Sequence, residues 1–387
     1  MSAEAVSSDA SADMVLDPDV IVRVEGLKKY FELRMGFLRS LHSKSVFVHA
    51  VDGLDFQLRR GEILGLVGES GCGKTTTGRL LSRLEVPTEG RILIRAESQG
   101  DKAGGPRGAA VDIASLDGRN LFQFRRELQM IFQDPYESLN PRFNVFRAVS
   151  EPLLIHSIGE TREQREELVI RALEDSGLRP GQDFMDRFPH ELSGGQRQRV
   201  SIARAVALNP KIIIADEPVS MLDVSIRAGV MNLMLDLRAK YQIPYVFITH
   251  DIAVARYMSD RIAVMYLGRI VETASTEDII SRPTHPYTRA LLSAVPIPDP
   301  EHVYSDVTIK GELPSPIDMP SGCRFRTRCL LAQEICKTTA PPNVEVFPGH
   351  FAECHFAADI FEGRLTEPVL ATRAPEVDPM LASSAKP

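Results

Sequence analysis

The segment from Gly68 to Thr75, GESGCGKT, constrains the fold of this chain more strongly than its other motifs. It matches the pattern G-x-x-x-x-G-K-[ST], which cradles phosphate groups when it follows a strand and opens a helix. The apolar run ILGLV at 63–67 precedes it directly, and the helical pattern TTGRLLSRL at 76–84 follows it. We therefore predict an α/β fold in which a phosphate-binding loop joins a buried strand to a helix.

The residue types of this loop each suit phosphate binding. Glycines allow backbone N–H groups to turn toward phosphate oxygens at the helix N-terminus. The Lys74 ammonium adds a positive charge for the β- and γ-phosphates, and the Thr75 hydroxyl is a ligand for Mg²⁺. Cys72 is a small residue that we expect to offer its backbone N–H. The predicted nucleotide-binding residues of the loop are Gly68, Glu69, Ser70, Gly71, Cys72, Gly73, Lys74, Thr75 and Thr76.

Polar side chains follow further apolar runs that predict one parallel, doubly wound sheet. Asp216 and Glu217 end the run KIIIAD and begin the next segment, His250 ends YVFITH, and Gln133 follows the run MIF. The carboxyl ends of parallel strands meet at one edge of a sheet, where catalytic sites form. We predict Glu217 as the general base and His250 as its catalytic partner at the γ-phosphate. The predicted Mg²⁺ ligands are Thr75, Gln133 and Asp216.

Composition narrows the class of protein. There are 45 Lys and Arg against 52 Asp and Glu, so the formal charge of -7 does not suggest nucleic acid as a partner. No apolar run approaches the roughly 20 residues that a membrane-spanning helix needs. The N-terminus is acidic and lacks the order of a secretory signal, so we expect the chain to remain in the cytosol.

Changes in pattern along the chain divide it into predicted parts. A chain of 387 residues exceeds the usual size of one hydrophobic core, which favours two domains or one large domain with an appendage. Polar, small residues at both ends predict disordered tails, and a Gly-, Ala- and Asp-rich insertion is expected to be mobile. The predicted boundaries are 1–17 for the first tail, 18–275 for the main domain, about 96–118 for the insertion, about 140–208 for a helical subdomain, 276–362 for a C-terminal extension and 363–387 for the last tail.

The segment LSGGQRQR at 192–199 opens a predicted helix, and with it the chain resembles an ATP-binding-cassette (ABC) ATPase over roughly residues 20–362. The resemblance implies a RecA-like parallel sheet core, an antiparallel β subdomain and a helical signature subdomain. Ser193 is a good helix N-cap, so the exposed N–H groups behind it form an anion site. The resemblance implies that the signature residues bind the γ-phosphate of ATP held by the opposite subunit; these are Ser193, Gly194, Gly195 and Gln196.

The same resemblance implies roles for four more positions: Gln133 as the Q-loop glutamine, Asp223 in the D-loop, His250 as the switch histidine and Phe31 as the ring that stacks on adenine. Tyr30 is adjacent to Phe31 and offers a second aromatic face, so the choice between them rests on strand register. Met221 stands in the D-loop where the family more often has alanine.

Four further stretches are similar to the ATP-binding subunits of bacterial oligopeptide and dipeptide importers, and more to the second, F-type, ATPase subunit of such systems. They are FQDPYESLNPR at 132–142, VHAVDGLDFQL at 48–58, GRLLSRLEVPTEGRI at 78–92 and THPYTRALL at 284–292. The resemblance implies hydrolysis of ATP coupled to peptide import at the cytoplasmic face of the plasma membrane. Import of nickel or another small solute is the alternative, and an ABC ATPase that acts on nucleic acid is disfavoured by the net charge.

Partners follow from the same resemblance. It implies a heterodimer with a second ABC ATPase subunit, two transmembrane permease subunits and an extracytoplasmic solute-binding protein. Tyr136, Leu139 and the helices at 145–175 would form a groove for a coupling helix of each permease. The alternative is that this surface is an ordinary packing face.

The C-terminal extension concentrates four cysteines, Cys323, Cys329, Cys336 and Cys354. Disulfides are disfavoured in the cytosol, and zinc ribbons prefer close Cys-x2-Cys pairs that are missing here. The spacing favours four thiolates around a larger iron–sulfur cluster, and the resembled ATPases carry a C-terminal [4Fe–4S] cluster on a similar pattern. Zinc and unligated thiols are the alternatives. Three arginines nearby would offset the cluster's charge or form a solvated basic strip: Arg324, Arg326 and Arg328.

Overall fold

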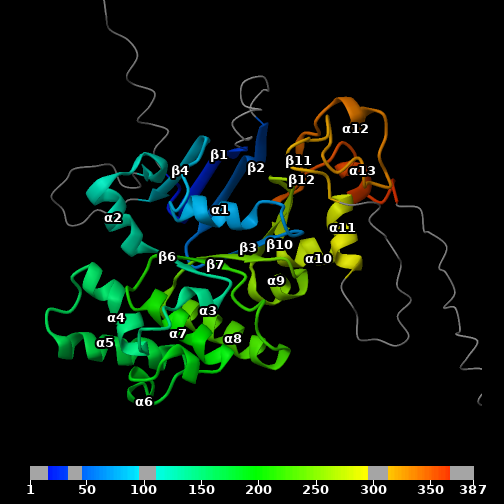
Figure 1. The fold of residues 1–387 in the computed structure, drawn as a ribbon. Helices are drawn as coiled ribbons and strands as arrows, with labels where there is room; N and C mark the ends of the chain where they lie inside the picture. The colour runs from blue at the N-terminus through cyan, green and yellow to red at the C-terminus, as the bar shows by residue number, and fades with distance from the viewer. Residues whose placement is uncertain (1–15, 34–45, 96–109, 295–312, 367–387) are drawn as a thin grey trace, which may run out of the picture.

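Two β-sheets form the framework of the computed structural model, which describes residues 16–33, 46–95, 110–294 and 313–366 (Figure 1). The strands of the larger sheet are β3 (Ile63–Val67), β6 (Leu128–Ile131), β7 (Ile212–Asp216), β8 (Tyr245–Thr249), β9 (Arg261–Tyr266), β10 (Arg269–Ser275), β11 (Asn343–Phe347) and β12 (His350–Glu353). Their spatial order is β11-β12-β10-β9-β3-β8-β7-β6. The smaller sheet has the order β2-β1-β4-β5 and contains β1 (Val20–Leu33), β2 (Val46–Arg59), β4 (Glu89–Arg95) and β5 (Ala110–Asp112).

The centre of the larger sheet is parallel and buried on both faces. β3 pairs in parallel with β8 and β9, and β7 pairs in parallel with β8 and β6. All residues of β3, β7 and β8 are buried, which agrees with their continuous apolar sequences. The predicted α/β class with a parallel core is therefore confirmed, together with an antiparallel second sheet.

Helices cover both faces of this sheet (Figure 1). They are α1 (Lys74–Leu81), α2 (Gly118–Glu127), α3 (Pro135–Ser138), α4 (Val145–Ile155), α5 (Arg162–Asp175), α6 (Gln182–Met185), α7 (Gly194–Val206), α8 (Val224–Tyr241), α9 (Ile252–Met258), α10 (Thr276–Ser281), α11 (Pro286–Ser293), α12 (Ile335–Thr338) and α13 (Ala357–Phe361). Leu80 and Leu81 of α1 belong to the core between the two sheets. A second core, on the opposite face of the larger sheet, joins α4, α5, α7 and α8.

Side-chain caps begin the helices of the helical region. The Asn144 side chain accepts a hydrogen bond at the start of α4, and Thr161 and Ser193 form capping boxes at the starts of α5 and α7. Such caps satisfy backbone N–H groups that have no partner within the helix. The Ser193 cap matters for the site because it fixes where α7 begins.

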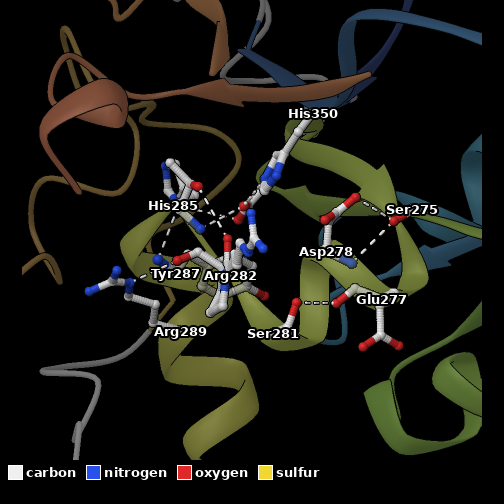
Figure 2. A network of polar contacts seen from close by, with 12 residues as sticks. Ser275, Glu277, Asp278, Ser281, Arg282, His285, Tyr287, Arg289 and His350 are labelled. Atoms are coloured by element: carbon white, nitrogen blue, oxygen red, sulfur yellow. Dashed lines mark hydrogen bonds and ion pairs between the residues drawn. The ribbon is translucent and has the colours of Figure 1, made fainter. Parts of the chain in front are cut away.

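The C-terminal extension continues the central sheet. β12 pairs antiparallel with the outer edge of β10, and β11 then pairs with β12. The carboxylate of Glu272 in β10 is buried and accepts hydrogen bonds from the N–H groups of Thr284, at 2.7 Å, and His285, at 3.0 Å. It also contacts His350 Nε2 of β12 at 2.7 Å. Figure 2 shows His285 and His350 side by side at this junction.

The described parts of the predicted tails and insertion differ from the sequence expectation. Leu16 is buried against Val20 and Ala110, because it completes a small apolar cluster at the smaller sheet. Residues 110–118 of the expected mobile insertion form β5, a short 3₁₀ helix and the start of α2, with Ile113 buried. Residues 1–15, 96–109 and 367–387, which complete those predicted segments, lie outside the described residues.

No helix within the described ranges is long and apolar enough to cross a membrane.

The buried Glu272 carboxylate yields a stability prediction. Glu272→Ala should lower the free energy of unfolding by about 3 kcal/mol, because it leaves two backbone N–H groups and His350 buried without their acceptor. Glu277→Ala, an exposed position on the following helix, is the control and should change stability little. Chemical denaturation of the full chain measures both, and equal stabilities of the two variants would contradict this role of Glu272.

Candidate active site

The phosphate loop follows β3 and turns sharply into α1. Gly71 and Gly73 have φ of +81° and +109°, in the left-handed region that other residues rarely adopt. A Cβ at Gly73 would lie 2.2 Å from the Ala50 carbonyl oxygen, and one at Gly68 would lie 2.2 Å from the Met265 carbonyl oxygen. Glycine is therefore required at 68 and 73 by close backbone approach, and at 73 by conformation as well.

Lys74 and Cys72 are held inside this loop. Lys74 Nζ is buried and donates to the carbonyl oxygens of Gly68, at 2.7 Å, and Glu69, at 3.0 Å. The Cys72 N–H donates to the Glu69 carbonyl at 3.3 Å, so it is engaged within the loop, unlike the sequence expectation that it is offered to phosphate. Burial raises the pKa of the Cys72 thiol, which keeps it neutral.

Oxygen donors gather beside the loop at the ends of β6 and β7. Thr75 Oγ1 donates to Asp216 Oδ1 at 3.2 Å. Burial raises the pKa of Asp216 to about 6, and the neighbouring Glu217 carboxylate adds to the rise. A hydroxyl, a carboxylate and the Gln133 amide oxygen are the hard donors that Mg²⁺ prefers, and a divalent cation would stabilise the charged form of this buried carboxylate. The donor set therefore fits Mg²⁺.

Two side chains from the neighbouring strand ends converge on the carboxylate that follows β7. Glu217 Oε2 accepts from Gln133 Nε2 at 3.2 Å and contacts His250 Nδ1 at 3.0 Å. Glu217 has φ of +46°, a left-handed conformation that is costly for glutamate and is characteristic of functional sites. All three residues line a pocket of about 430 Å³ together with loop residues from Ser70 to Thr76. The predicted catalytic residues and the phosphate loop thus share one pocket.

Strand register separates the two candidate adenine-stacking rings. Phe31 lies opposite Val48, which lines the pocket, and the Phe31 side chain is 36% exposed. Tyr30 lies opposite His49, and its hydroxyl donates to Asp52. Cross-strand partners share a face, so the register favours Phe31 as the ring beside the nucleotide pocket. Its stacking on adenine stays a prediction.

The signature residues lie away from this pocket. Ser193 Oγ accepts from the Gln196 N–H at 3.3 Å, and Gln196 Oε1 accepts from the Ser193 N–H at 2.9 Å. A Cβ at Gly195 would lie 2.6 Å from Ile226 Cγ2, so close packing of α7 on α8 requires glycine there. The structure describes all of residues 193–196, and none of them lines the pocket. Their predicted role toward ATP on another subunit stays a prediction.

The predicted D-loop continues from Glu217, the predicted general base, to α8. Ser220 Oγ donates to the Glu217 carbonyl at 3.0 Å, and Asp223 is the N-cap residue of α8. The side chains of Met221 and Val224 are 59% and 80% exposed. This short segment therefore links the catalytic strand end to an apolar surface.

The prediction that Leu139 lines the groove for a coupling helix is wrong. Leu139 is 2% exposed and belongs to the core beneath α4 and α7, because its side chain points inward after α3. Tyr136 is 62% exposed, and Leu154 and Ile155 of α4 are more than half exposed. An open apolar surface is present, but Leu139 does not contribute to it.

The four cysteines of the extension are free thiols within one module. The Cys323 N–H donates to the Cys336 carbonyl at 2.8 Å, which joins two of the four positions. Burial raises the pKa of Cys329 and of Cys354 to about 12, and the nearby thiols add to it. Among the described residues no group of three or more His, Cys, Asp or Glu has the geometry to hold a metal ion.

Two of the three arginines next to the cysteines differ from both expected roles, which were to offset the charge of a cluster or to form a solvated basic strip. Arg324 donates to the Leu267 carbonyl and pairs with Asp52, and Arg328 pairs with Glu69 of the phosphate loop. Both guanidinium groups therefore contact the ATPase domain, because the turn of the extension that carries them packs against that domain.

Sequence reasoning missed the contacts that the extension makes with the nucleotide pocket. Pro316 lines the pocket, and its carbonyl accepts from the His49 N–H at 3.0 Å. The Tyr287 hydroxyl accepts from the Glu69 N–H at 2.9 Å. Tyr287 belongs to the stretch THPYTRALL, which signals the subfamily but carries no local sign of this contact.

A strand, phosphate loop and helix, with a carboxylate, a glutamine and a histidine at adjacent strand ends, define an ABC-type ATPase. The "ABC transporter" family matches residues 51–220, and the "Oligopeptide/dipeptide transporter, C-terminal region" family matches residues 271–336. The chain belongs to the ABC transporter family, as an ATP-binding subunit that carries the oligopeptide/dipeptide transporter C-terminal region.

Relatives and solved structures agree with this membership. The oligopeptide transport ATP-binding protein AppF of Bacillus subtilis is 46% identical over 340 residues, which cover 87% of this chain and 97% of that protein. A post-hydrolysis dimer of the ATP-binding cassette MJ0796 with ADP and phosphate is 29% identical, with a TM-score of 0.54, over 66% of this chain and 99% of that one. The transporter component cbiO1 of Clostridium perfringens is 26% identical, with a TM-score of 0.54, over 67% and 90%.

The contacts of Glu217 yield a prediction for hydrolysis. Glu217→Gln should retain ATP binding but reduce the rate of ATP hydrolysis by about 100-fold or more, because the amide cannot accept a proton from water. Glu167→Gln, at an exposed position of α5, is the control and should keep the wild-type rate. Phosphate release and equilibrium ATP binding by the full chain measure the two effects, and near-normal turnover of Glu217→Gln would remove Glu217 from this role.

Proposed function

We propose that this chain is the ATP-hydrolysing subunit of an importer that couples ATP binding and hydrolysis to uptake of di- or oligopeptides across the plasma membrane. The observation that carries the peptide cargo is the match of residues 271–336 to the oligopeptide/dipeptide transporter C-terminal region. A relative named as an oligopeptide transport protein, nearly all of whose length is covered, supports the same cargo.

The arrangement of the pocket supports a mechanism for hydrolysis. The phosphate loop and Lys74 bind the phosphates, and Mg²⁺ held by Thr75, Asp216 and Gln133 would neutralise charge that develops on them. Gln133 and His250 both contact Oε2 of Glu217, which leaves Oε1 to accept the proton of the attacking water. His250, with its side chain about half exposed, would then contact the γ-phosphate directly.

The signature residues of this chain do not line the pocket in which ATP would bind. A second ATPase subunit would therefore complete the proposed site. The signature segment of that subunit would supply the helix N-terminus that faces the γ-phosphate here, and Ser193 and its neighbours would do the same for ATP held by the partner. We assign the partner as a different ABC ATPase, which gives a heterodimer. Met221 of this chain, which is exposed in the predicted D-loop, would lie at the boundary between the two subunits.

Membrane partners are proposed from the exposed apolar surface of the helical region. Tyr136, in the segment that follows Gln133, and Leu154 and Ile155, at the end of α4, are all more than half exposed. A helix from each of two permease subunits would cover this surface and link transport to the position of Gln133. An extracytoplasmic solute-binding protein would deliver the cargo, and the chain would be peripheral at the cytoplasmic face of the plasma membrane.

Uptake assays test the cargo. In cells that lack this protein, uptake of a labelled di- or tripeptide should be lost and should return with the wild type but not with Glu217→Gln. Labelled nickel measured in the same cells is the matched control and should be unaffected. Intact peptide uptake with lost nickel uptake would assign the transporter to metal import instead.

We also propose that Cys323, Cys329, Cys336 and Cys354 hold a [4Fe–4S] cluster. The Cys329 thiol lies close enough to the other three for each of them to raise its pKa, so the four soft ligands are gathered in one module. A cubane separates its four sulfur ligands more widely than a single tetrahedral zinc does, and the four cysteines lack the close Cys-x2-Cys pairs that zinc ribbons prefer. When bound, the cluster would supply a covalent link among the four segments of the extension.

Metal analysis distinguishes the cluster from zinc. The full chain purified without oxygen should contain iron and acid-labile sulfide in about a 1:1 ratio, with a broad visible absorbance. Cys336→Ser should lose most of the iron, whereas Cys72→Ser, which changes the cysteine of the phosphate loop, should keep it. Zinc in place of iron, or neither metal, would contradict the proposed cluster.

A further inference from the structure

Two residues of the C-terminal extension, Tyr287 and Arg328, contact Glu69 of the phosphate loop. We infer that Arg328 and Tyr287 of the extension are positioning residues of the nucleotide site, and that Arg328 neutralises an acidic side chain that would otherwise repel the phosphates of ATP. The inference rests on the proposed assignment of residues 68–76 as the ATP-binding loop. It requires no metal in the extension.

Every polar group of Glu69 has a partner. Its carboxylate accepts two hydrogen bonds from Arg328 Nη1, at 3.0 and 3.1 Å. Its N–H donates to the Tyr287 hydroxyl at 2.9 Å, and its carbonyl accepts from Lys74 Nζ at 3.0 Å. The backbone at Glu69 is therefore fixed from two sides, by the loop lysine and by two residues of the extension.

The extension side chains that reach Glu69 are themselves immobilised. Tyr287 is fully buried, and the Arg328 side chain is 8% exposed. The Tyr287 ring packs against Tyr266 and Phe325, with ring centroids 4.7 and 5.4 Å apart, and Phe325 also packs edge-on against Tyr266. Close-packed aromatic rings leave Arg328 and Tyr287 few alternative rotamers. They can therefore hold Glu69 in one position.

A buried turn connects these residues to the central sheet. Figure 2 shows Tyr287 close to His285, from which it is separated in sequence by Pro286. His285 Nδ1 accepts from the Tyr287 N–H at 3.1 Å, and burial lowers the pKa of His285 to about 4, so the ring stays neutral and keeps this acceptor. The N–H of His285 donates to Glu272 of β10. Glu272 of the sheet therefore helps to fix the position of the Tyr287 hydroxyl through its hydrogen bond with His285.

Charge explains why the contact matters for ATP. Glu69 places a carboxylate in the loop that has to bind an anionic triphosphate, one residue before Ser70, which lines the pocket, and like charges repel where water is partly excluded. Arg328 pairs with this carboxylate, so the net charge near the phosphates is set by the pair and not by Glu69 alone. Loss of Arg328 would expose the negative charge and also release one side of the loop.

The test measures Mg-ATP binding and steady-state ATP hydrolysis of the full chain. Arg328→Met should raise the dissociation constant and KM for ATP by about tenfold, while kcat at saturating ATP stays within about twofold, because the hydrolytic residues are untouched. Tyr287→Phe removes a single oxygen and keeps the packed ring, so it should weaken binding by about threefold. Arg326→Ala is the matched control, since that side chain bonds Ser321 in the same module, and it should bind ATP as the wild type does.

A second substitution distinguishes charge neutralisation from a merely structural role. Glu69→Gln combined with Arg328→Met removes the unpaired carboxylate, so the double variant should regain most of the wild-type affinity. If Arg328 only supported the fold of the extension, the double variant would bind no better than Arg328→Met. That result, or an Arg328→Met variant with wild-type affinity and wild-type KM, would overturn the inference.

Two controls separate this inference from the proposed function. Lys74→Ala should abolish ATP binding in the same assay. A wild-type chain that does not bind ATP would contradict the assignment of the loop, and with it the inference. Wild-type binding that is lost in Lys74→Ala but unchanged in Arg328→Met would overturn the inference alone. Thermal unfolding of each variant shows whether a change in binding reflects loss of folded protein.

Discussion

Parallel pairing of three short buried strands is the constraint on which the rest of this structure depends. Val67 of β3 lies opposite Thr249 of β8, and Asp216 of β7 lies opposite Ile248 of β8. The three strands therefore end level with one another, and each chain segment leaves the sheet at the same edge. A shift of one residue in any strand would direct its side chains to the other face and separate Glu217 from its partners.

Much of the pocket could be predicted because its residues belong to short local patterns. The glycines of the phosphate loop, the two carboxylates after IIIA and the histidine after YVFIT each follow an apolar run that determines a strand and its end. That these residues lie at one edge of the sheet could be predicted without knowledge of the order of its strands. The choice between Phe31 and Tyr30 did need tertiary information, because bulges in the pairing of β1 with β2 change which ring faces the pocket.

The contacts of the extension could not be predicted in the same way. The pairing of β10 with β12 covers only two residue pairs, and the short β12 sequence HFAE carries no pattern that specifies this partner. Arg328 and Arg324 sit beside cysteines, which suggested roles toward a cluster, whereas their partners are acidic residues in the first fifth of the chain. Leu139 failed as a surface prediction for a related reason, since burial after a short helix depends on how α4 and α7 pack.

The contact between Glu69 and Arg328 joins residues 259 positions apart in the chain. Contacts at such separation form late, since the intervening segment must be synthesised and folded first. A ribosome-bound chain that has already completed β3, β7 and β8 still lacks the arginine that balances Glu69. The order of synthesis therefore delays this contact until residue 328 has been made, so that a nascent chain that ends before it carries an unfinished loop.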